Sequence, residues 1–110
     1  MYSNYLLASG CPMLHECWQP GLGKMFRGET AKLFLKVMDS VWERGEEEAE
    51  AIAAMLKRNG VDAGSSLLEL GAGNGRVAIP LARRGYRVTG VEASEVFVAD
   101  GRRRVEEAGL

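Results

Sequence analysis

The pattern of hydrophobic and polar positions changes at about residue 29. Residues 1–28 have little periodicity and hold both cysteines, the single histidine and two of the three prolines. We therefore expect an irregular N-terminal arm there. From Glu29 to Arg44 apolar side chains recur at helical spacing, and residues 46–59 form a second helical stretch with glutamates in its first turn. Gly45 is expected to separate these two helices.

The second half of the chain alternates between short apolar runs and helical stretches. The apolar run at residues 67–70 is bounded by turn residues and is typical of a buried parallel strand. A helix is expected over 76–84, a second strand over 86–91 and a last helix over 94–108. Strands alternating with helices indicate an α/β fold with a parallel sheet and right-handed crossovers. Pro80 is expected near the second turn of its helix, where it removes one backbone donor.

Length and charge narrow the class of protein. The chain has 110 residues, enough for one small domain, and we place that domain at residues 29–110. Its 14 basic and 15 acidic side chains are nearly balanced, which gives no general reason to expect nucleic acid or an anionic membrane as partner. No apolar run approaches the roughly 18 residues that a membrane span needs. Two cysteines without a secretory signal indicate a reducing, cytoplasmic location.

The strongest chemical signal is a glycine-rich turn between a strand and a helix. Residues 71–75 read Gly-Ala-Gly-Asn-Gly, which places backbone N–H groups at a helix N-terminus and lets a ligand approach the backbone closely. The next strand ends in Glu92, whose carboxylate can accept two hydrogen bonds from the vicinal hydroxyls of a ribose. The G-x-G-x-G spacing, with Arg76 after it, counts against a nicotinamide-dependent oxidoreductase, because the dinucleotide fingerprint is G-x-G-x-x-G.

These residues resemble a known family. The run from Glu69 to Gly75, followed by Val91-Glu92-Ala93-Ser94, is similar to the first two motifs of the class I S-adenosylmethionine-dependent methyltransferases. The segment 76–86 resembles the helix that joins those motifs, including its proline. The resemblance covers about residues 66–109. It implies the N-terminal, cofactor-binding portion of a Rossmann-like methyltransferase fold, with S-adenosyl-L-methionine as cofactor.

The resemblance also implies which residues hold the cofactor. Glycines of the turn would line its methionine and ribose part, Glu69 would lie near the methionyl end, and Glu92 would hold the ribose hydroxyls. The last two residues of the second motif would lie near the adenine edge. The implied cofactor site comprises nine residues: Glu69, Gly71, Ala72, Gly73, Asn74, Gly75, Glu92, Ala93 and Ser94.

The same resemblance predicts that the sheet is incomplete in this chain. Only two strands of the larger family sheet have counterparts, and no residue matches the family's catalytic or substrate-binding positions, so the catalytic residues and the methyl acceptor stay unknown. The strand at 67–70 would have one neighbour and an unpaired outer edge. We therefore expect methyl transfer to require a C-terminal methyltransferase half, a partner chain or self-association, and the chain alone to be inactive. The alternative is a non-catalytic methyltransferase-like subunit that stabilises a catalytic partner.

Two further clusters have more ordinary interpretations. Cys11, His15 and Cys17 lack a fourth ligand, whereas structural zinc usually has four, so we predict free thiols and no metal site. The arm that carries them could close over the cofactor as a lid.

The arginines between residues 76 and 104 could contact RNA, but arginines at consecutive helix positions point in different directions, and solvated faces are the favoured interpretation.

Overall fold

The computed structural model describes residues 4–7 and 24–110, and it confirms the α/β fold with a parallel sheet. The elements, in chain order, are β1 (Asn4–Leu7), α3 (Gly28–Ser40), α4 (Arg44–Arg58), β2 (Ser66–Leu70), α5 (Ala78–Arg83), β3 (Arg87–Glu92) and α6 (Glu95–Glu107). The elements from α3 to α6 follow the predicted order helix, helix, strand, helix, strand, helix. None of the helices in the described part of the chain is long and apolar enough to cross a membrane.

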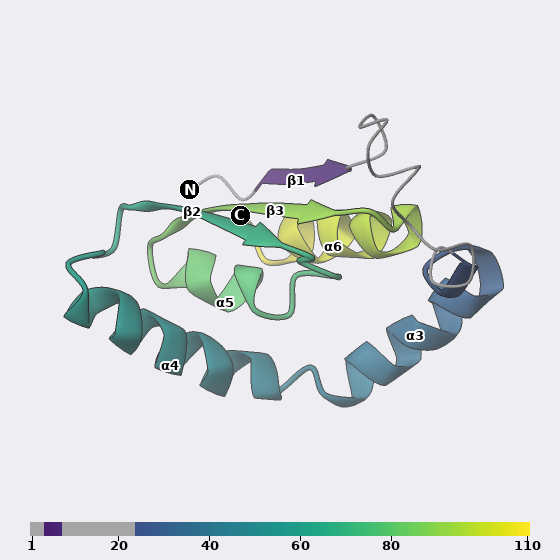
Figure 1. Cartoon of the computed structure of the whole chain (residues 1–110), viewed down its shortest axis with the longest axis horizontal. Helices are drawn as coiled ribbons and strands as arrows, with labels where there is room; N and C mark the ends of the chain where they lie inside the picture. The colour runs from purple at the N-terminus through teal and green to yellow at the C-terminus, as the bar shows by residue number, and fades with distance from the viewer. Residues whose placement is uncertain (1–3, 8–23) are drawn as a thin grey trace.

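The sheet has three parallel strands in the order β1-β3-β2. β2 and β3 pair from Ser66 opposite Arg87 to Leu70 opposite Val91, so both strands end at the same edge of the sheet. Figure 1 shows α5 directly beneath the sheet and α4 beneath α5. This β2-α5-β3 unit places the segments that follow the two strands side by side.

β1 is an element that the sequence analysis did not expect. Residues 4–7 lie within the region predicted as an irregular arm, yet they pair in parallel with β3, with Asn4 opposite Thr89 and Leu7 opposite Glu92. A strand of four residues is too short to show a periodic pattern. Residues 8–23 lie outside the described part of the chain. The predictions for the cysteines, the histidine and a lid therefore stay predictions.

One part of the core lies between the sheet and helices α4 and α5, and a second part joins α5 to α6. Leu67 of β2 and Val88 of β3 point to the same side, where they pack against α4 and α5. Ala49 of α4 and Ala82 of α5 are fully buried. These small side chains let α4 lie close to α5. α4 therefore joins the N-terminal helices to the β2-α5-β3 unit.

The predicted helix boundary at Gly45 is wrong. α3 ends at Ser40, the chain turns at residues 41–43, and α4 begins at Arg44, so Gly45 lies inside α4. A Cβ atom at Gly45 would lie 2.1 Å from the carbonyl oxygen of Arg76, far inside contact distance. Glycine is therefore required here by close packing rather than by a break in the helix.

Pro80 also lies earlier in its helix than predicted. α5 begins at Ala78, so Pro80 is in the first turn, where an N–H group has no partner within the helix. The proline therefore removes no hydrogen bond from the helix interior. In a longer helix, a residue with an N–H group at position 80 would pair with the carbonyl of Arg76, but here that carbonyl faces Gly45.

We predict that Gly45→Ala destabilises the chain by about 1–3 kcal/mol, because the new methyl group would force α4 away from Arg76. At an unhindered helix position the same change would stabilise by roughly 0.5–1 kcal/mol, so the sign of the effect is diagnostic. Urea unfolding followed by circular dichroism measures it. Glu47→Ala, at an exposed position of the same turn, is the control. Equal or higher stability of the Gly45→Ala chain would contradict the close contact.

Candidate functional site

The segment between β2 and α5 is a tight turn that depends on glycine. Gly71, Gly73 and Gly75 have φ angles of 68°, 58° and 90°, values that side-chain-bearing residues rarely adopt. The backbone N–H groups of Gly71 and Ala72 both donate to the carbonyl oxygen of Val91, at 2.8 and 3.1 Å. The glycine turn is thus tied to the last residues of β3.

Glu92 closes this connection with its side chain. Its Oε2 atom accepts a hydrogen bond from the N–H of Gly73 at 2.9 Å. Its Oε1 atom accepts from the N–H groups of Ala93 and Ser94, at 2.8 and 2.9 Å. The carboxylate therefore bridges the two segments that the sequence motifs identified, and three backbone donors fix its orientation.

The nine residues implied by the resemblance differ in how far solvent reaches them. Gly71 and Ala93 are exposed, Glu69 and Glu92 are half-buried, and the rest are buried. Ser94 is the N-cap of α6: its Oγ accepts from the N–H of Phe97 at 3.4 Å and donates to the carbonyl of Phe26 at 2.7 Å. Its side chain is thus occupied by contacts within the protein.

Met38 of α3 covers the glycine turn, a contact that the sequence analysis did not predict. A Cβ atom at Gly73 would lie 2.6 Å from the Cε atom of Met38. From the sequence, Met38 is one of several apolar residues at helical spacing. Because a methionine side chain is flexible, Met38 can shift when a ligand approaches the turn.

Asn74 points away from solvent, toward α6. Its side chain is fully buried, and its Nδ2 atom donates to Oδ2 of Asp100 at 3.1 Å. Asp100 is a second residue that the sequence analysis did not single out. Burial opposes ionisation of its carboxyl, but hydrogen bonds from Arg104, Arg103 and Asn74 outweigh burial and lower the pKa of Asp100 below its ordinary value.

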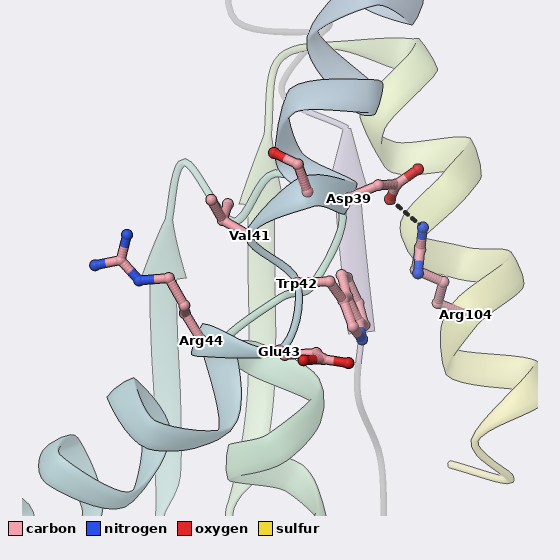
Figure 2. Close-up of a pocket in the computed structure, with 7 residues that line it drawn as sticks. Asp39, Val41, Trp42, Glu43, Arg44 and Arg104 are labelled. Carbon is pink, nitrogen blue, oxygen red and sulfur yellow. Dashed lines mark hydrogen bonds and ion pairs between the residues drawn. The ribbon is translucent and has the colours of Figure 1, made fainter.

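A hollow of about 500 Å³ lies between the α3–α4 junction and α6 (Figure 2). On one wall, the guanidinium of Arg104 lies over the ring of Trp42, 4.0 Å from its centroid, and pairs with Asp39 at 2.5 Å. The charges on this wall are therefore already paired within the protein. The hollow is lined by Asp39, Ser40, Val41, Trp42, Glu43, Arg44 and Arg104.

Glu69 is the residue of the site with the most perturbed ionisation. Burial raises the pKa of its carboxyl to about 7, against a smaller opposing effect of the nearby Arg76. Its Oε2 atom is buried, and no group in the described part of the chain donates to it or accepts from it. Glu69 is thus partly protonated near neutral pH and holds one oxygen without a partner beside the glycine turn.

The described part of the chain contains no candidate metal centre near this turn. No group of three or more His, Cys, Asp or Glu side chains within residues 4–7 and 24–110 is arranged to hold a metal ion. Cys11, His15 and Cys17, considered above as ligands, fall outside these residues.

Comparison with known proteins identifies the fold that this site belongs to. Residues 67–110 match a family described as a methyltransferase domain. A crystal structure from Methanococcus maripaludis, assigned to the S-adenosyl-L-methionine-dependent methyltransferases, superposes with a TM-score of 0.62 at 22% sequence identity, over 77% of this chain and 38% of that one. At that identity the likeness shows the fold alone, and it confirms the partial Rossmann-like methyltransferase fold.

Two curated relatives are also similar to this chain, and the name of one of them includes the cofactor S-adenosyl-L-methionine. An S-adenosyl-L-methionine-dependent Diels-Alderase of Neonectria sp. is 41% identical over 58 residues, covering 53% of this chain and 24% of its own length. A ubiquinone biosynthesis O-methyltransferase of Paramagnetospirillum magneticum is 43% identical over 47 residues, covering 43% of this chain and 19% of its own length. The chain thus spans a quarter or less of these relatives.

The sequence resemblance is therefore confirmed: residues 67–110 match a methyltransferase domain, and the fold is similar to part of an S-adenosyl-L-methionine-dependent methyltransferase. S-adenosyl-L-methionine is the cofactor that the family and the relatives imply.

We predict that Glu69 makes the chain less stable as the pH rises. The unfolded carboxyl has a pKa near 4.5 and the folded one about 7, so between these values only the unfolded chain releases the proton. The free energy of unfolding should fall over this window by roughly 1–2 kcal/mol, allowing for the solvent that still reaches the group. Glu69→Gln should lose this slope. Urea unfolding at pH 4.5 to 8 measures it, and Glu106→Gln, which removes an exposed carboxyl, is the control. A Glu69→Gln chain that keeps the full slope would refute the assignment.

Proposed function

We propose that this chain is the S-adenosyl-L-methionine-binding portion of a class I methyltransferase. The observation that carries the proposal is the bridge between Glu92 and the N–H of Gly73, at 2.9 Å. It holds an acidic strand end beside a glycine turn at one edge of a parallel sheet, the arrangement that suits a nucleoside ligand.

In this proposal Glu92 accepts the ribose hydroxyls. A carboxylate offers about four acceptor positions, and three backbone donors already orient this one, so one position is left for a hydroxyl and the Gly73 bond can yield another. Because its orientation is fixed before the ligand arrives, little ordering remains to be done on binding.

Glu69 has a separate role near the methionyl end. Its half-buried carboxyl is largely neutral below pH 7 and holds an oxygen that has no hydrogen-bond partner among the described residues, so it can act on the ligand through the turn or through a water molecule. When bound, the cofactor supplies a methyl group made electrophilic by its positively charged sulfur. The residues on this chain bind and orient it.

The names of the relatives support cofactor binding more directly than any one reaction. One is named as an S-adenosyl-L-methionine-dependent Diels-Alderase and the other as an O-methyltransferase. Methyl transfer by a protein that contains this chain is accordingly the finer part of the proposal. The methyl acceptor is not assigned, and neither is a catalytic residue.

We also propose that the chain works only together with further structure. Leu68 and Leu70 of β2 are 65% and 75% exposed, on the face of the strand opposite the packed Leu67. β2 is also an edge strand of the sheet that the described residues form. Exposed leucines beside an unpaired edge favour a covering partner, either a C-terminal methyltransferase half or a second copy of this chain. A cytoplasmic setting is part of the same proposal and rests on the two cysteines.

Calorimetric titration with S-adenosylhomocysteine, with NADH as control, tests the cofactor assignment. We expect saturable binding of the first alone. Glu92→Ala should weaken it by about tenfold or more, because the hydroxyls would lose a charged acceptor. Glu95→Ala, in the exposed first turn of α6, is the matched control and should bind as the unaltered chain does.

Absence of binding to a folded chain would contradict the cofactor half-site. If Glu92→Ala bound poorly but left the activity of the completed enzyme unchanged, the chain would be a non-catalytic subunit that stabilises its partner.

We predict that the exposed face of β2 drives association. Replacing both Leu68 and Leu70 by lysine should shift the chain toward monomer, or abolish capture of the completing half, since charge on this face opposes burial. Sedimentation velocity at micromolar concentration measures the shift. Met55→Lys, at another exposed apolar position on α4, is the control. An unaltered chain that is a cooperatively unfolding monomer would argue against the need for a partner.

A further inference from the structure

We infer that Asp100 is a positioning residue for the glycine turn, which it holds through Asn74. The inference rests on the proposed cofactor binding and adds to it a residue that does not belong to either sequence motif. Asp100 lies in the second turn of α6, and the contact that matters is its hydrogen bond with the Asn74 amide, 3.1 Å long.

Asn74 lacks an alternative partner for this amide. Its side chain has no solvent exposure, and its Oδ1 atom has no hydrogen-bond partner among the described residues. The side chain therefore cannot rotate toward water to satisfy its N–H groups. Without Asp100, a buried donor would be left unpaired, and the turn would have to shift to expose it.

The Asp100 carboxylate is itself held in place by neighbours on α6. Nε of Arg104 donates to its Oδ2 at 2.8 Å, the same oxygen that accepts from Asn74. A terminal nitrogen of Arg103 donates to its Oδ1 at 2.6 Å. Both oxygens are thus oriented by charged donors three and four residues along the helix, so the acceptor presented to Asn74 is rigid and ionised.

The same network reaches the glycine turn from a second side. Arg104 also pairs with Asp39 and lies over Trp42, as Figure 2 shows. Met38, the residue before Asp39, is the side chain that covers Gly73. Contacts from α6 therefore hold Asn74 directly and reach Gly73 through α3.

A shift of Asn74 would change the position of the Gly73 N–H group, which donates to Glu92. Asn74 directly follows Gly73, whose N–H bonds to Glu92, and directly precedes Gly75, whose carbonyl begins the hydrogen bonding of α5. A shift of Asn74 moves both neighbours. Asp100 would thus control cofactor affinity without touching the cofactor.

The test compares variants of Asp100 in the full chain by titration with S-adenosylhomocysteine. Asp100→Leu keeps the approximate size but removes both acceptor oxygens, and we expect about a tenfold loss of affinity. Asp100→Asn keeps one acceptor oxygen and should recover most of that loss. Glu106→Ala, which removes an exposed carboxyl from the same helix, should bind as the unaltered chain does.

Two readouts separate positioning from general stability. In a double-mutant cycle, Asn74→Ala and Asp100→Leu should weaken binding non-additively, because both break one interaction. In the NMR spectrum of the unliganded chain, the side-chain amide signals of Asn74 should move in Asp100→Leu and stay in Glu106→Ala.

The outcomes are distinguishable. If the unaltered chain binds and Asp100→Leu binds equally well, or if the two losses simply add, the positioning role is wrong while the proposed function stands. If the unaltered chain does not bind, the proposed function fails and this inference fails with it.

Discussion

The hydrogen bond from the N–H of Gly73 to the carboxylate of Glu92 joins the ends of two parallel strands, and the geometry of the site depends on it. It forms only because β2 and β3 pair in a register that ends both strands at one sheet edge. A slip of one residue would move every side chain of β2 to the opposite face of the sheet, and Leu67 would leave the side on which it packs with Val88. The observed register brings the glycine turn to the carboxylate.

Much of the fold was predictable because the segment from α4 to α6 is locally consistent. Its strands are short runs between turn residues, its helices carry basic residues in the last turn and are followed by glycine, and α4 and α6 carry acidic residues in the first turn. The predictions were wrong where tertiary contacts decide the role of a residue. Gly45 resembles a helix break in the sequence, but its close contact with Arg76 requires glycine within the helix. β1 was missed because its pairing with β3 is decided at the opposite end of the chain.

Some residues of the candidate site were likewise predictable from the sequence, and others were not. The glycine turn and Glu92 were identifiable because their chemistry lies in short motifs at a readable separation. Asp100 and Met38 were not, since an acidic residue on a charged helix and a methionine at helical spacing have ordinary explanations until the packing is known. The structure also shows that motif residues differ in kind: Asn74 and Ser94 direct their side chains into the protein, while Ala93 is exposed.

The position of β1 has a consequence for the order of folding. β2, α5 and β3 follow one another in the chain, so their assembly closes only short loops, whereas residues 8–86 lie between β1 and β3. During synthesis β1 leaves the ribosome first, but its partner strand is complete only once residue 92 has emerged. We therefore expect the β2–β3 pair to form first and β1 to join the sheet afterwards.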